Sequence, residues 1–175
     1  MAAVAADAPS LPCRIAVSGA GASDEPGLAD AMALAERLGA ALARAGAVVV
    51  TGGLGGVMTA AARGARAAGG LTIGILPGAR AAGANPWITI PIVTDLGHAR
   101  NAILVHTAEA LVAVGGSYGT LSEIALALKI GVPVAGLGSW EMARPGHEAP
   151  PMHTFVEPDA AAAWALAAAR ARRRS

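Results

Sequence analysis

The chain has 175 residues with a formal net charge of +1, and 54% of them are hydrophobic while only 14% are charged. This length suits one domain around a single core, and the near-neutral charge excludes the overall basic character of a typical nucleic-acid-binding protein. With one cysteine, Cys13, the chain can form neither an intramolecular disulfide nor a cysteine metal cluster, and no apolar run reaches the roughly 18 residues of a membrane helix.

The N-terminal residues 1–12 are rich in alanine but lack the basic start and the long apolar stretch of a signal peptide. We therefore expect a cytoplasmic protein with neither a membrane nor a nucleic-acid partner. The domain organisation that we predict is a disordered segment over 1–12, one nucleotide-binding domain over 13–170 and a basic tail over 171–175.

From residue 13 onward, short apolar runs alternate with segments of helical periodicity. The runs predict strands over 14–18, 47–51, 71–76, 87–90, 111–114, 132–137 and 153–156. Apolar residues at helical spacing predict helices over 28–45, 57–68, 95–109, 120–128 and 159–172, the last with Asp159 as its N-cap. This alternation predicts an α/β fold: a doubly wound Rossmann-like sandwich with a mainly parallel sheet, in a single domain.

Glycine-rich turns follow the first, second and fifth of these strands. They read GAG at 19–21, GGLGG at 52–56 and GGSYG at 115–119. Glycine leaves backbone N–H groups accessible to an anion, and the N-terminus of the following helix adds partial positive charge, so the turn at 115–119 predicts a phosphate cradle. Because ligands sit at the carboxyl ends of parallel strands, all three turns are expected at the ligand-binding edge of the sheet.

Two common nucleotide motifs do not fit these turns. A dinucleotide site needs a third glycine where Asp24 stands, and an acidic residue after the second strand, where the chain has Thr51-Gly52-Gly53. A Walker loop needs Gly-Lys-Ser/Thr after a strand, and the chain has none. Two glycine turns after two different strands instead indicate one compact phosphate-bearing ligand held between them.

Two charged residues, Glu123 and Arg100, are candidates for chemistry near the cradle. Glu123 is expected in the first turn of the helix that follows 115–119. A structural role is open for both, since Thr120-x-x-Glu123 has the form of a capping box and Arg100 can be a solvated or helix-pairing arginine. The four histidines show no zinc-ligand spacing with a carboxylate or cysteine, so no metal site is expected.

Three segments together resemble one known family. TGGLGGVM at 51–58, HARN at 98–101 and GGSYGTLSE at 115–123 are similar to the GGG-x-x-G-x-M, R-[KN] and PGG-x-GT-x-x-E signatures of the LOG-like superfamily, long mislabelled as lysine decarboxylases. The resemblance covers about residues 14–137, and the motifs come in the family's order and spacing.

The resemblance implies two alternative functions. One branch of the superfamily hydrolyses the N-glycosidic bond of nucleoside 5′-monophosphates to free base and ribose 5-phosphate without a cofactor, whereas the other includes molybdenum-cofactor carriers and nucleotide-binding proteins. This chain departs from the hydrolase motifs at Thr51, Asn101, Val114 and Ser122. These departures favour the carrier branch, with the molybdenum cofactor as bound ligand, and leave the phosphoribohydrolase as the alternative.

The resemblance also implies roles for particular residues. Glu123 and Arg100 take the positions of the family's catalytic glutamate and arginine. The predicted ligand-binding positions are Gly19, Gly52, Gly53, Gly55, Gly56, Met58, Gly115, Gly116, Ser117, Tyr118, Gly119 and Thr120. Met58 is also an ordinary core residue at a helix start, and Trp87 and Trp140 are candidates for covering a ligand. The family further implies a homo-oligomer, a dimer or larger, with sites for a small phosphorylated ligand near the interface.

Overall fold

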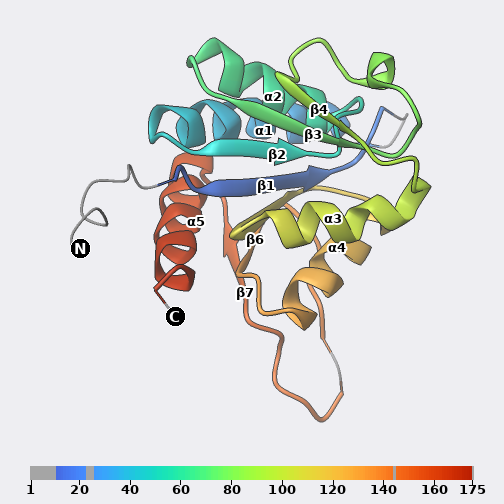
Figure 1. Ribbon diagram of the computed structural model, residues 1–175. Helices are drawn as coiled ribbons and strands as arrows, with labels where there is room; N and C mark the ends of the chain where they lie inside the picture. The colour runs from blue at the N-terminus through green and yellow to red at the C-terminus, as the bar shows by residue number, and fades with distance from the viewer. Residues whose placement is uncertain (1–10, 23–25, 144, 175) are drawn as a thin grey trace, which may run out of the picture.

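One sheet of seven parallel strands runs through the part of the chain that the computed structural model describes, residues 11–22, 26–143 and 145–174 (Figure 1). The strands are β1 (Arg14–Gly19), β2 (Val48–Thr51), β3 (Thr72–Leu76), β4 (Ile90–Val93), β5 (Ala110–Val114), β6 (Val134–Leu137) and β7 (Met152–Phe155). Their order across the sheet is β4-β3-β2-β1-β5-β6-β7, and every neighbouring pair is parallel.

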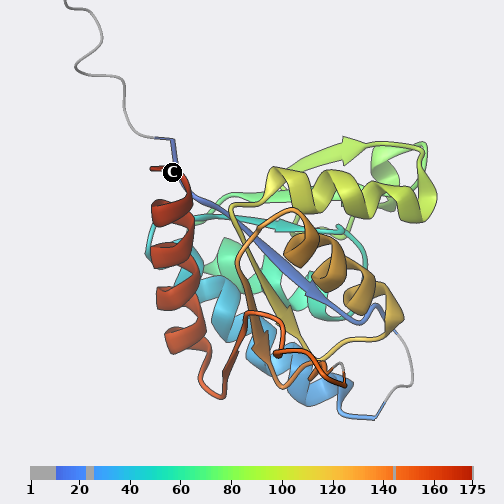
Figure 2. The ribbon, with the colours of Figure 1, turned by 90° about the horizontal axis from the view of Figure 1, so that it is seen from below.

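Helices cover both faces of this sheet. They are α1 (Leu28–Arg44), α2 (Val57–Ala67), α3 (Arg100–Thr107), α4 (Tyr118–Lys129) and α5 (Pro158–Arg172), with two short 3₁₀ turns, η1 (Ala81–Gly83) and η2 (Gly97–Ala99). The first two helices and α5 pack on one face, while α3 and α4 pack on the other (Figure 2). The predicted doubly wound α/β fold with a parallel sheet is confirmed.

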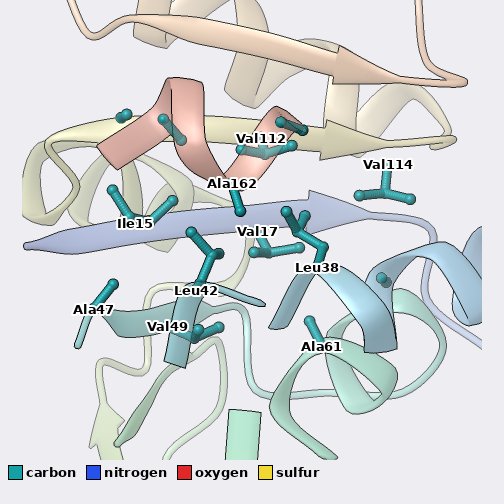
Figure 3. Packing of buried hydrophobic residues seen from close by; sticks show 14 of the residues in the cluster. Ile15, Val17, Leu38, Leu42, Ala47, Val49, Ala61, Val112, Val114 and Ala162 are labelled. Atoms are coloured by element: carbon teal, nitrogen blue, oxygen red, sulfur yellow. The ribbon is translucent and has the colours of Figure 1, made fainter. Parts of the chain in front are cut away.

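Each face of the sheet has its own hydrophobic core. On the α1 side the core is formed by aliphatic residues of the strands and the helix, among them Ile15, Val17, Val49, Leu38 and Leu42 (Figure 3). Small residues let α1 and α2 approach closely, because a Cβ on Gly39 would collide with the carbonyl oxygen of Ala61. Close helix packing thus accounts for part of the chain's richness in alanine and glycine.

The fourth strand lies three residues later than predicted. Residues 87–89 are held by the side chain of Thr72, whose Oγ donates to the carbonyl of Trp87 at 2.6 Å and accepts from the N–H of Thr89 at 2.9 Å. The strand forms only at Ile90–Val93, at the edge of the sheet, where Pro91 is tolerated.

Three predicted helix boundaries are also wrong. The helix expected from residue 95 begins at Arg100, because Asp95 and Gly97 both have a left-handed φ of 53°. The last helix begins at Pro158 with Glu157 at the N-cap position, so Asp159 lies inside the first turn and does not cap it. The helix expected to be capped by Thr120 begins at Tyr118, as described below.

The first described residues lie beside the C-terminal end of α5. Of the predicted disordered segment 1–12, residues 1–10 lie outside the described residues, and Arg173 donates hydrogen bonds to the carbonyls of Leu11 and Pro12. Of the predicted basic tail, residues 171 and 172 continue α5.

Candidate functional site

The glycine turns meet where the direction of strand progression reverses. β1 lies between β2 and β5, and the chain builds outward to β4 on one side before crossing back to β5 on the other. The carboxyl ends of β1, β2 and β5 therefore surround the switch point, which is where doubly wound sheets bind ligands.

A buried carboxylate lies at this point. The Glu123 side chain is only 8% exposed; its Oε1 accepts a hydrogen bond from Nη1 of Arg100 at 3.0 Å, and its Oε2 accepts one from the hydroxyl of Ser18. The three residues come from different elements, since Ser18 is the penultimate residue of β1, Arg100 begins α3 and Glu123 lies on α4. The structure thus brings together the two predicted catalytic residues and adds a serine to them.

Burial sets the electrostatics of this cluster. Removal from water raises the pKa of Glu123 above its ordinary value, although the hydrogen bond from Ser18 and the charge of Arg100 act in the opposite direction. Arg100 is itself buried, and its Nε is the one buried side-chain nitrogen or oxygen without a hydrogen-bond partner among the described residues. A cationic donor without a partner is unusual inside a protein and is available to a ligand or a water molecule.

The capping-box interpretation of Glu123 is wrong. Helix α4 begins at Tyr118 with Ser117 at the N-cap position, so Glu123 is in the second turn and its carboxylate faces Ser18 and Arg100 instead of the helix N-terminus. The same start means that the prediction of Glu123 in the first turn is wrong as well.

The N-terminus of α4 is left open. Ser117 makes no side-chain capping hydrogen bond, and no acidic residue lies in the first turn. A Cβ added at Gly119 would meet no atom within 4 Å, so this position of the first turn borders open space. Unsatisfied N–H groups at a helix N-terminus attract an anion.

Two pockets flank the loop over 115–120. The first, which we call the Glu123 pocket, has a volume of about 140 Å³ and contains eight of the predicted site residues, namely Gly19, Gly52, Met58, Arg100, Ser117, Gly119, Thr120 and Glu123. The second, which we call the Trp140 pocket, has about 460 Å³ and is lined by Gly115, Gly116, Trp140, Asp30 and the start of α1, among others. The loop therefore contributes to both pockets.

The remaining predicted positions line neither pocket. Gly53, Gly55 and Gly56 lie in the turn between β2 and α2, where Gly53 and Gly56 have positive φ and a Cβ on Gly55 would lie 3.0 Å from Cβ of Ala22. Tight packing accounts for these three glycines. Tyr118 is 80% exposed, and its ring contacts that of Trp140 at a centroid distance of 5.8 Å.

Gly52 has a specific reason to lack a side chain. A Cβ there would collide with the guanidinium of Arg100 and lie 2.8 Å from Sδ of Met58. Gly52 therefore makes room for the arginine that pairs with Glu123.

The sequence did not lead us to predict Ser18, His98 or Asn101 as site residues, although all three line the Glu123 pocket. The available signal for Ser18 was a lone hydroxyl at the end of a buried apolar strand, directly before a glycine turn. Within the described ranges the structure shows no group of three potential metal ligands and no helix that is both long and apolar enough to cross a membrane.

Comparison with known proteins supports the resemblance in sequence. Residues 12–162 match the model of the SLOG cluster4 family. An uncharacterized protein of Archaeoglobus fulgidus is 50% identical over 124 residues, which is 71% of this chain and 79% of that protein.

Two solved structures are similar over nearly their whole length. The molybdenum cofactor binding protein from the phototrophic bacterium Rippkaea orientalis has a TM-score of 0.77 and 33% identity, covering 89% of this chain and 96% of that one. A Moco carrier protein from Chlamydomonas reinhardtii has a TM-score of 0.76 and 37% identity, covering 90% and 99%.

Proposed function

This chain belongs to the SLOG cluster4 family, and from that premise we propose that it binds a compact phosphate-bearing ligand at the switch point and carries it unchanged, as a molybdenum-cofactor-carrier-like protein. The observation that carries the proposal is the uncapped N-terminus of α4, which has open space at Gly119 and follows a loop that lines two pockets.

The first turn of α4 is the proposed phosphate site. Its N–H groups lack a side-chain cap, and Gly119 leaves them accessible. Together with the helix dipole they offer several donors and a partial positive charge, which is the usual way in which a protein holds a phosphate without a lysine. Gly115 and Gly116, both with positive φ, shape the loop that precedes this turn.

The pocket residues fit the molybdenum cofactor as cargo. The pterin of that cofactor carries a phosphate, which the α4 turn would hold, and the loop over 115–120 opens on both sides into a pocket that can receive the rest of the molecule. Arg100, with one free donor, adds a second charged contact on the side of the Glu123 pocket.

One observation favours hydrolysis as the second candidate. A buried glutamate that pairs with an arginine and a serine beside the phosphate site has the chemistry needed to cleave an N-riboside. In that reaction Glu123 would stabilise the positive charge that develops at the anomeric carbon or orient a water, while Arg100 would position the substrate.

The test is direct loading. Free molybdenum cofactor, extracted from a molybdoenzyme without oxygen, is mixed with the protein, and molybdenum and pterin are measured after gel filtration. We expect both to co-elute with the wild type and not with Gly119→Asp, in which a carboxylate is added beside the proposed phosphate site at a position with room for a side chain. Elution of all cofactor as free small molecule would contradict the carrier function.

A parallel assay addresses the hydrolase. Nucleoside 5′-monophosphates are incubated with the protein, and free base is followed by chromatography. We expect none, and release of base that disappears in Glu123→Gln would establish the hydrolase in place of the carrier.

A further inference from the structure

The Trp140 pocket has an aromatic wall that is fixed in place. The indole Nε1 of Trp140 donates to the carbonyl of Ser117 at 3.3 Å, and the ring contacts that of Tyr118. The side chain also packs against the hydrophobic core on the α3 and α4 side. A rigid indole beside a cavity is a stacking surface for a flat ring.

One charged side chain, exposed to solvent, lines the pocket. Asp30, in the first turn of α1, is the single charged residue among those that line the pocket, and it has no ion pair or side-chain hydrogen bond within the described residues. The other polar side chain, Ser139, already donates to the carbonyl of Gly115 at 2.6 Å. A free carboxylate with two acceptor oxygens suits a ligand with two adjacent N–H donors.

The pocket lies beside the proposed phosphate site, because Trp140 in its wall donates to the carbonyl of Ser117 at the N-cap position of α4. Gly115 and Gly116 line it, and the same loop leads directly into the open turn of α4. A ligand whose phosphate lies on this turn can therefore place its ring in the Trp140 pocket.

We propose that the Trp140 pocket binds a 2-amino-4-oxo-pyrimidine ring, as found in pterins and guanine, stacked on Trp140 with its ring N–H and 2-amino group donating to Asp30. This inference rests on the proposed function and adds to it a preference among ring systems. Adenine has no adjacent ring N–H and amino donors of this kind, and hypoxanthine has the ring N–H but lacks the 2-amino group. Asp30 and Trp140 are assigned here as determinants of ligand choice.

The experiment compares GMP, IMP and AMP, with 6-hydroxymethylpterin phosphate as the pterin arm. Binding is measured by titration calorimetry and by quenching of tryptophan fluorescence. We expect the wild type to bind GMP about tenfold more tightly than IMP, because the lost contact is a hydrogen bond to a charged group. Relative affinity for GMP and the pterin phosphate then tells which source of the ring the pocket prefers.

Matched variants isolate the two determinants. Asp30→Asn should abolish the preference for GMP over IMP, whereas Asp159→Asn, which changes another first-turn aspartate, should retain it. Trp140→Phe should remove the fluorescence quenching while Trp164→Phe, a change at a tryptophan packed against His153 and Phe155, should keep it.

Each negative result has a distinct meaning. Equal affinities for GMP and IMP, a preference that survives in Asp30→Asn, or quenching that survives in Trp140→Phe overturns the ring assignment. If the monophosphates still bind in a manner that Gly119→Asp abolishes, the phosphate site stands without it. If neither the nucleotides nor the pterin phosphate bind, the phosphate site and the ring assignment both fall.

Discussion

Glu123 is a buried carboxylate whose charge is held by residues from two other elements. Arg100 and Ser18 stabilise its ionised form, but burial outweighs them and raises its pKa. Because the pKa of Glu123 differs between the folded and the unfolded protein, its protonation contributes to the free energy of unfolding as well as to the charge of the Glu123 pocket.

The pH dependence of stability tests this balance. Above pH 4.5, the ordinary value for a glutamate, the folded protein holds the Glu123 proton more tightly than the unfolded chain does, so this residue makes the free energy of unfolding fall as pH rises through its raised pKa. Glu123→Gln should lack that contribution. Urea unfolding between about pH 4.5 and 8 measures the slope, and an identical slope in both proteins would show that Glu123 titrates normally.

A second prediction concerns the room that Gly52 leaves for Arg100. Gly52→Ala should cost about 1–3 kcal/mol of stability, because the new methyl group overlaps the guanidinium and crowds Met58. Gly83→Ala is the control, since a Cβ there meets nothing within 4 Å and should change stability by less than about 0.5 kcal/mol. Thermal unfolding of both variants gives the comparison, and equal melting temperatures would mean that Arg100 is not fixed where the structure has it.

Among the secondary-structure elements, α4 offers a test in its first turn, where an added carboxylate should stabilise the fold and weaken phosphate binding. A helix N-terminus is stabilised by a nearby carboxylate, while the same carboxylate repels a phosphate. Gly119→Asp should therefore raise the free energy of unfolding by about 0.3–1 kcal/mol and weaken binding of a nucleoside monophosphate at least about tenfold. Loss of both stability and binding would indicate a misfolded loop instead of an occupied anion site.

The existence of the helices and strands was predicted from the sequence more accurately than the residues at which they begin and end. Buried strands such as β2 and β5 are recognisable as continuous apolar runs that end at a glycine turn, and the alternation of strands and helices fixes a parallel, doubly wound sheet. The start of α3 could not be predicted, because only the left-handed backbone at Asp95 and Gly97 keeps the preceding residues out of the helix.

The candidate site was predictable where it rests on local pattern and not where it rests on distant contacts. The glycine turns converge because parallel strands end at one edge. Glu123 and Ser18, however, lie 105 positions apart in the sequence, so no local pattern joins them. The residues Thr120 to Glu123 also match the pattern of a capping box, which gives Glu123 a purely structural role. Only the start of α4 at Tyr118 decides between the two roles.

At the scale of the whole molecule, a charge cluster ties the C-terminal helix to the start of the sheet. Glu109 accepts hydrogen bonds from the backbone N–H of Arg14 at 2.8 Å and from Nη2 of Arg173 at 2.7 Å. Burial raises the pKa of Glu109, but Arg173 and Arg14 together outweigh it and hold the pKa below its ordinary 4.5. The stability that this cluster gives is therefore present above pH 4.5 and lost as pH falls through the lowered pKa.

Removing this carboxylate should be costly. Glu109→Gln should lower the free energy of unfolding at pH 7 by about 2 kcal/mol, because the two arginines lose a partly buried partner. Arg37→Gln, which breaks the exposed pair with Glu157, should cost less than about 1 kcal/mol. Denaturant unfolding measures the free energy of unfolding of both variants. Equal small losses would mean that packing alone holds the end of α5 beside the start of β1.

In the proposed function, the phosphate of the ligand lies on the N-terminus of α4 and the ligand is bound without being cleaved. The most direct test is titration calorimetry of the wild type with a nucleoside 5′-monophosphate and with its nucleoside, followed by chromatography of the mixture. We expect at least about tenfold tighter binding of the monophosphate and no free base. Equal affinity for the nucleoside, or steady release of base, would contradict it.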